Sequence, residues 1–169
     1  MAADERGGAR AMVEYLRSIG RSRIATITGP LDTFGGRGRL EGYRDVVGAA
    51  FDESLVEEGD YAQDSGERAM TKLLDRRPDL DAVFVASDAM ALGALNALRG
   101  AGRRVPEDVA IGGFDDSAAA LAARPALTTI RQPWQRVSSE MVRLLLAAIS
   151  GEEPSAVILP TELVRRGSA

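Results

Sequence analysis

The stretch Asp81-Ala-Val-Phe-Val-Ala-Ser-Asp88-Ala-Met-Ala-Leu-Gly-Ala-Leu-Asn-Ala-Leu-Arg99 decides the fold of this chain. Its β-branched and aromatic run at 83–85 predicts a buried strand. Apolar residues recur after it at helical spacing, namely Met90, Ala91, Ala94, Leu95 and Leu98. Ser87 and Asp88 therefore fall at the carboxyl end of a strand, where open parallel sheets form ligand crevices. Two roles stay open for Asp88, because it can contact a ligand or serve only as the N-cap of the helix.

The composition indicates one soluble domain with a sizeable core and excludes several classes of function. The chain has 169 residues, 45% of them hydrophobic, and a formal net charge of -4, which argues against direct binding to nucleic acid. It contains no cysteine and no histidine. Disulfides, thiolate catalysis and histidine chemistry are therefore excluded, and we expect a protein that is not an enzyme and has no cofactor.

The chain shows neither a membrane-spanning segment nor a signal peptide. Its longest apolar runs, such as 144–149, are far too short to cross a bilayer. Residues 1–6 lack the basic and then apolar build of a secretory leader. We therefore expect a cytoplasmic protein without a membrane partner.

Strand and helix patterns alternate along the sequence. Strands are expected at 23–28, 54–59, 83–85, 105–114 and 127–133, with an edge strand or crossover at 156–165. Helices are expected at 8–19, at about 40–47, from Asp64 to before Pro78, at 88–99, in an alanine-rich run ending at Ala123, and at 137–149. This alternation predicts an α/β fold, a three-layer sandwich with a mostly parallel sheet.

A glycine-rich loop follows the first expected strand and invites a nucleotide-binding interpretation. The loop Leu31-Asp-Thr-Phe-Gly-Gly-Arg-Gly-Arg-Leu-Glu-Gly-Tyr43 has Gly36 and Gly38, but Glu41 stands where a dinucleotide fingerprint needs glycine. A Gly-Lys-Ser/Thr phosphate loop is also missing. We therefore exclude a dinucleotide or phosphate-loop site.

Polar and aromatic residues follow each expected strand, at ends that share one edge of a parallel sheet. They are Thr33, Arg39, Tyr61, Ser87, Asp88, Phe114, Asp115, Asp116 and Gln132. Arginine offers a planar fork of donors, aspartate accepts hydrogen bonds and tyrosine has a flat apolar face. This set predicts a pocket for a small polyhydroxylated or planar heterocyclic ligand. A cation held by Asp115 and Asp116 is the alternative, but adjacent residues that leave a strand point in different directions, so we predict no metal site.

Several motifs, in order, resemble the effector-binding domain of the LacI family of bacterial transcriptional repressors. The resemblance runs from about Ala3 to Arg166. The motifs are I-A-T-I-T-G-P-L, G-R-L-E-G-Y, V-E-E-G-D-Y, S-G-E-R-A-M, A-V-F-V-A-S-D-A-M-A-L-G-A-L, R-V-P-E-D-V-A-I-G-G-F-D-D and L-T-T-I-R-Q-P. The resemblance implies a type I periplasmic-binding-protein-like fold that closes over a sugar or purine-like effector.

The resemblance also implies roles for individual residues. Arg39 matches the family arginine that grips the effector, Tyr61 the aromatic that stacks on it, and Asp88 an acid that accepts hydrogen bonds from it. Further contacts are implied for Thr33, Gly35, Asp115 and Gln132, and for Ser87, which stands where many members have asparagine.

The family pattern implies that this chain holds only the C-terminal portion of a sensor. Residues 4–131 would form the C-terminal subdomain, 132–161 a helix and strand of the N-terminal subdomain, and 162–169 a return segment and tail. Operator DNA would be bound only through a helix-turn-helix domain outside this chain, and a homodimer is expected.

The apolar segment at 133–160 would either fold back or pair with another copy. Alternatives are a sugar-binding component of a transport system and an enzyme on the same sheet.

Overall fold

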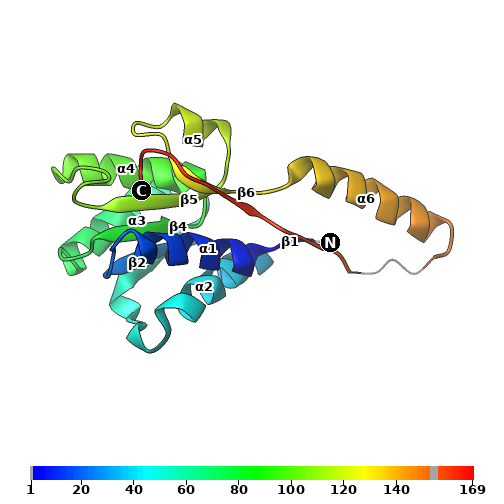
Figure 1. Ribbon diagram of the computed structural model, residues 1–169, viewed down its shortest axis with the longest axis horizontal. Coiled ribbons are helices and arrows are strands. Elements are labelled where there is room, and N and C mark those ends of the chain that lie inside the picture. Colours follow the sequence, from blue (N-terminus) through cyan, green and yellow to red (C-terminus); the bar gives the residue numbers. More distant parts are fainter. Residues whose placement is uncertain (1, 153–155) are drawn as a thin grey trace.

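The structure is a computed structural model that describes residues 2–152 and 156–169. It confirms the predicted three-layer sandwich (Figure 1). Six strands form the central sheet in the order β3-β2-β4-β5-β6-β8, with β8 antiparallel to β6 and all other neighbours parallel. Their bounds are β2 Ile24–Thr28, β3 Val56–Glu58, β4 Ala82–Val85, β5 Ala110–Asp115, β6 Thr128–Arg131 and β8 Glu162–Val164.

Helices cover both faces of this sheet, so its central strands are buried on both sides. The helices α1 (Glu5–Ser18) and α2 (Phe34–Val47) pack on one face. The other face is covered by α3 (Gln63–Arg76), α4 (Asp88–Gly100) and α5 (Ala118–Ala122). On β4, Phe84 packs with the first group and the neighbouring Val83 and Val85 with the second. Burial on both faces explains why this strand is apolar throughout rather than alternating.

Several expected boundaries are wrong, and local structure explains three of them. Helix α1 begins at Glu5 because the Asp4 carboxylate accepts from the Gly7 amide at 2.8 Å. The expected strand at 54–59 begins only at Val56, since Glu53–Leu55 form a 3-10 turn. The strand expected from residue 105 begins at Ala110, because Asp108 accepts from the Arg104 amide at 2.9 Å and closes a turn.

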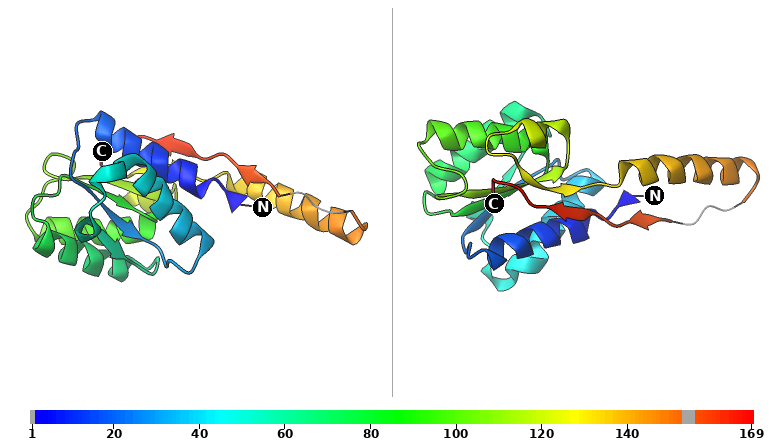
Figure 2. Two further views of the ribbon diagram at one scale, coloured as in Figure 1. Left: turned by 90° about the horizontal axis from the view of Figure 1, so that it is seen from below. Right: turned by 45° about the horizontal axis from the view of Figure 1, so that its top comes forward.

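Helix α6 (Trp134–Ile149) projects away from the sandwich and does not fold back onto it (Figures 1 and 2). None of its residues is buried, and several of its apolar side chains are exposed, namely Met141, Val142, Leu145, Leu146 and Ile149. Part of the segment 132–161, which is expected to join a second subdomain, lies outside the described residues, namely 153–155. Met1 also lies outside them. Among the described residues, no helix combines the length and apolarity needed to cross a bilayer.

A second, two-stranded sheet lies at the base of this projection. Strand β1 (Ala2–Ala3) pairs in parallel with β7 (Ile158–Leu159), which follows α6 in the sequence. The pairing continues at Asp4, whose amide donates to the carbonyl of Leu159 at 2.8 Å. This β1–β7 ribbon lies on the same side of the sandwich as α6 and holds the N-terminal segment beside the segment that follows α6, whereas the C-terminus returns to the sandwich (Figure 2).

Candidate ligand-binding site

A cavity of about 490 Å³ lies at the carboxyl ends of the parallel strands. Five predicted residues line it, namely Arg39, Tyr61, Ser87, Asp115 and Gln132. Ala89, Ser117 and Trp134 complete its wall. Residues from five separate stretches of sequence therefore meet where the strand ends predict a ligand crevice.

Arg39 is fixed by contacts on several sides although it is an ionised group. It is only 6% exposed, and its Nε donates to Glu5 Oε2 at 2.6 Å. Its Nη1 donates to the carbonyl of Ala86, and its guanidinium carbon lies 3.8 Å from the ring centroid of Phe114. Aromatic stacking and charge-assisted bonds pre-organise the planar fork. The arginine thus reaches the cavity in a single orientation.

Asp115 and Gln132 form a polar pair beside this arginine. Gln132 Nε2 donates to Asp115 Oδ1 at 2.8 Å, and the same oxygen lies 3.8 Å from Arg39 Nη2. Burial raises the pKa of Asp115 to about 6, although Arg39 and Gln132 act in the opposite direction. The cavity therefore offers cationic, anionic and amide groups close together, which suits a ligand with several hydroxyl groups.

Two aromatic side chains flank these polar groups. The Tyr61 ring lies 5.9 Å from the Arg39 guanidinium carbon, and Tyr61 has a positive φ of 70°. Gly29 makes room for the ring, since a Cβ at Gly29 would lie 2.2 Å from the Tyr61 hydroxyl oxygen. Trp134, the first residue of α6, is 55% exposed and lines the same cavity. Flat apolar faces of this kind can cover the non-polar face of a sugar ring.

Ser87 has two roles in the structure. Its side chain is the N-cap of α4, accepting from the Met90 amide at 3.2 Å, and the residue also lines the cavity. Asp88 is the first residue of α4 and not its N-cap, so the interpretation of Asp88 as only an N-cap is wrong.

Three predicted residues do not line the cavity. The Thr33 hydroxyl caps α2, accepting from the Gly36 amide at 3.0 Å and donating to the Pro30 carbonyl at 2.7 Å. Gly35 lies just behind the wall, where an added Cβ would be 3.5 Å from the Tyr61 hydroxyl. Asp88 is 0% exposed, and its carboxylate accepts from the Ser117 amide and the Thr129 hydroxyl inside the protein.

The acidic pair at the end of β5 diverges, as the sequence predicts. Asp115 faces the cavity, whereas Asp116 accepts from Arg131 at 2.6 Å and from Arg166 at 2.5 Å. The two carboxylates therefore have different partners and do not converge on a common cation.

Sequence reasoning missed four residues of the site: Glu5, Ala89, Ser117 and Trp134. Glu5 is an acid in the first turn of a helix, a common placement that carries no functional signal by itself. Trp134 is the only tryptophan and follows the strand-end residues Gln132 and Pro133 directly, so its position in the sequence is the one signal that could have identified it.

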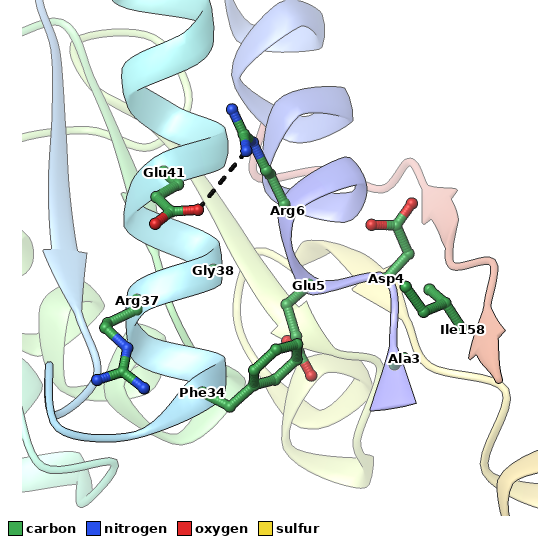
Figure 3. A pocket seen from close by; sticks show the side chains of 9 residues that line it. All are labelled: Ala3, Asp4, Glu5, Arg6, Phe34, Arg37, Gly38, Glu41 and Ile158. Atoms are coloured by element: carbon green, nitrogen blue, oxygen red, sulfur yellow. Dashed lines mark ion pairs between the residues drawn. The ribbon is translucent and has the colours of Figure 1, made fainter. Parts of the chain in front are cut away.

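A second cavity, of about 330 Å³, opens between the first turns of α1 and α2 and the β1–β7 ribbon (Figure 3). The exposed side chains of Phe34 and Ile158 line it, and Arg6 and Glu41 lie at one end as an ion pair at 3.7 Å. Of the residues that contact Arg39, only Glu5 lines this second cavity. The cavity at the strand ends is lined by five of the residues predicted from the sequence and the second cavity by none of them, so we take the cavity at the strand ends as the candidate site.

Comparison with known proteins identifies similar chains over nearly the full length. The family described as periplasmic binding protein-like domain matches residues 13–169. The HTH-type transcriptional regulator CelR of Thermobifida fusca is 51% identical over 98% of this chain, and the repressor PurR of Escherichia coli is 38% identical over 91%. The chain spans about half the length of these curated relatives, 50% of the first and 47% of the second.

Solved structures give the same result. A complex of the transcriptional regulator CelR with cellobiose superposes with a TM-score of 0.96 at 49% identity, covering 99% of this chain and 53% of that one. A Lac repressor dimer bound to operator and the anti-inducer ONPF superposes with a TM-score of 0.92 at 32% identity, covering 98% of this chain and 59% of that one.

Proposed function

The chain belongs to the periplasmic binding protein-like family, as part of the effector-binding domain of a LacI-type regulator, and from this premise we propose that it senses a small sugar. The effector would be a disaccharide of the cellobiose type, bound in the cavity at the strand ends. The observation that carries this proposal is the single orientation of Arg39, stacked on Phe114 and bonded to Glu5, beside the pair Asp115 and Gln132. Neighbouring hydroxyl groups of a sugar match such a fork of donors and acceptors.

The aromatic residues support a sugar over other polar ligands. Tyr61 and Trp134 offer ring faces at the cavity wall, and the C–H groups of a pyranose ring can pack on them. The structure of the CelR relative in complex with cellobiose supports the same class of ligand. Arg39, Tyr61, Ser87, Asp115 and Gln132 would contact the effector directly.

The wider organisation is also part of the proposal. Residues 4–131 and 162–169 would form one subdomain with its tail, and 132–161 would pack with a second subdomain that closes over the effector. The exposed apolar side chains of α6 support this division, since such surface is unusual in water. A homodimer would bind operator DNA through a part of the protein that this chain does not include, and the coverage of only half of each relative supports this.

The role would be binding and not catalysis, and it would be exercised in the cytoplasm. The relatives named above are transcriptional regulators, and the chain has no histidine or cysteine to serve as a general base or thiolate. An effector that favours the closed form over the open one would shift the population that binds DNA. The transport alternative shares the fold, but no observation on the site favours it.

A titration of cellobiose followed by the fluorescence of Trp134, the only tryptophan, tests the proposal. We expect a saturable change for cellobiose, little change for adenine or glycerol, and loss of the response in Arg39→Ala. Arg17→Ala is a matched control, because Arg17 is an exposed arginine that donates to the Val46 carbonyl far from the cavity. The absence of a response to cellobiose and to other disaccharides would exclude the proposed ligand class.

A further inference from the structure

The turn that follows β5 has an unusual backbone. Asp115 and Asp116 have φ angles of 114° and 55°, although neither is glycine. Positive φ is rarely adopted by residues with a Cβ and persists where surrounding contacts enforce it. Asp115 reaches the cavity from this turn, so whatever enforces the turn also places the carboxylate of Asp115.

The carboxylate of Asp88 lies directly beneath this turn. Its Oδ2 accepts from the Ser117 amide at 2.8 Å, and its Oδ1 accepts from the Thr129 hydroxyl at 2.6 Å. The Thr129 hydroxyl in turn accepts from the Asp116 amide at 3.4 Å. One carboxylate therefore holds two consecutive amides of the turn, one directly and one through a hydroxyl.

The packing around Asp88 is built for this arrangement. Asp88 is 0% exposed, and burial raises the pKa of its carboxyl group. A Cβ at Gly113 would lie 2.4 Å from Asp88 Oδ1, so only glycine permits β5 to approach the carboxylate this closely. A buried carboxylate is unfavourable unless its oxygens accept hydrogen bonds, and both oxygens do so here.

We propose that Asp88 is a positioning residue, which does not touch the effector but holds the β5–α5 turn so that Asp115 faces the cavity. The inference rests on the proposed function for its binding consequence, and on the hydrogen bonds alone for its structural one. Without the carboxylate, the Ser117 amide loses its acceptor and the Thr129 hydroxyl, which accepts from the Asp116 amide, loses the group that orients it. The turn can then leave its positive-φ conformation. Effector affinity then falls in proportion to the fraction of molecules that keep the competent turn.

Substitution of Asp88 separates positioning from direct contact. Asp88→Asn retains an oxygen for the Ser117 amide, and its Nδ2 can donate to the Thr129 hydroxyl, which is able to accept. Asp88→Ala removes both interactions. Asp108→Ala is the matched control, because Asp108 also accepts from a backbone amide and closes a turn, but at the opposite end of β5 from the cavity.

Two readouts on the 169-residue chain test the positioning role. They are hydrogen exchange of the Asp116 and Ser117 amides, and the dissociation constant for cellobiose from Trp134 fluorescence. We expect Asp88→Ala to accelerate exchange and weaken binding by roughly tenfold or more. Asp88→Asn should keep slow exchange and bind within roughly threefold of the unsubstituted chain. Asp108→Ala should change neither readout. If Asp88→Ala does not fold, Thr129→Val is used in its place. This variant removes the acceptor of the Asp116 amide and is expected to accelerate hydrogen exchange of that amide.

Two results would overturn the inference. If Asp88→Asn binds cellobiose as weakly as Asp88→Ala while its Ser117 amide stays protected, Asp88 contacts the effector directly. If neither Asp88→Ala nor Thr129→Val accelerates exchange in the turn, Asp88 does not hold it. A chain that fails to bind any disaccharide counts against the proposed function alone, because the exchange measurement still tests the positioning role without a ligand.

Discussion

Glu5 and Arg39 lie 34 residues apart in sequence, yet Arg39 Nε donates to Glu5 Oε2 at 2.6 Å, with side-chain exposures of only 7% for Arg39 and 11% for Glu5. Glu5 belongs to the first turn of α1, directly after the residues that pair with β7. Arg39, at the centre of the candidate site, is thus bonded to a residue that directly follows the β1–β7 ribbon.

We expect Glu5→Gln to weaken cellobiose binding by roughly three- to tenfold, because a neutral amide holds the Arg39 guanidinium less firmly than a carboxylate does. The dissociation constant is measured by the fluorescence of Trp134. Glu14→Gln is the control, since Glu14 is an exposed partner of Arg10 on the same helix. Unchanged affinity in Glu5→Gln would show that Phe114 and the Ala86 carbonyl suffice to orient the arginine.

The raised pKa of Asp115 predicts how stability depends on pH. The pKa is about 6 in the folded protein against an ordinary value of 3.8, so the folded state binds the proton more tightly than the unfolded state. The contribution of Asp115 to stability is therefore fully present below the lower pKa and is lost as the pH rises through about 6.

The variant Asp115→Asn tests this sign. Between the two pKa values, the unfolding free energy of the unsubstituted protein should decline with rising pH, and Asp115→Asn should remove on the order of 2 kcal/mol of this decline. Urea unfolding of both proteins across this pH range gives the difference. A decline of equal size in both proteins would mean that Asp115 is ionised without penalty in the folded state.

Thr33 illustrates a predicted site residue whose measurable effect should be on stability. Thr33→Ala removes the N-cap of α2, and we expect the unfolding free energy to fall by about 1 kcal/mol while cellobiose affinity changes little. Thr33→Ser keeps a hydroxyl that can accept from the Gly36 amide and should stay close to the original stability. A large loss of affinity in Thr33→Ala at unchanged stability would instead indicate direct contact with the effector.

Helix α6 should tolerate charge where the other long helices do not. Leu145 is 61% exposed, so Leu145→Lys should change the unfolding free energy of this chain by less than about 0.5 kcal/mol. Leu95 in α4 is only 4% exposed, so Leu95→Lys buries an ammonium group and should lower the unfolding free energy by roughly 3 kcal/mol or more. Urea unfolding compares the two variants. Similar losses in both would show that the exposed face of α6 packs against the chain in solution.

The order of strands and helices could be predicted because each buried strand carries a continuous apolar run and each helix an apolar stripe. The run at 83–85 predicts β4 closely, since both faces of that strand are covered. The prediction was weakest at strand starts. At Val56 and Ala110, turns held by Asp52 and Asp108 replace the expected extended backbone, and aspartate in those positions also suits a loop or a cap.

The candidate site could be predicted as a set of strand ends but not as a set of contacts. Parallel topology brings Arg39, Tyr61 and Asp115 to one edge, and this follows from the pattern alone. Which side of the wall a residue faces depends on partners far away in sequence. Asp88 is directed inward by Thr129 and Ser117, 41 and 29 residues away, and no local pattern reports such distances.

The β1–β7 ribbon has a mechanical consequence. Ala2–Ala3 and Ile158–Leu159 come from opposite ends of the sequence, but hydrogen bonds join them side by side. A pair of bonded strands behaves as a strap, in which a load applied to one strand is shared by the other. A displacement of the segment after α6 is therefore transmitted through these hydrogen bonds to the start of α1, where Glu5 contacts Arg39.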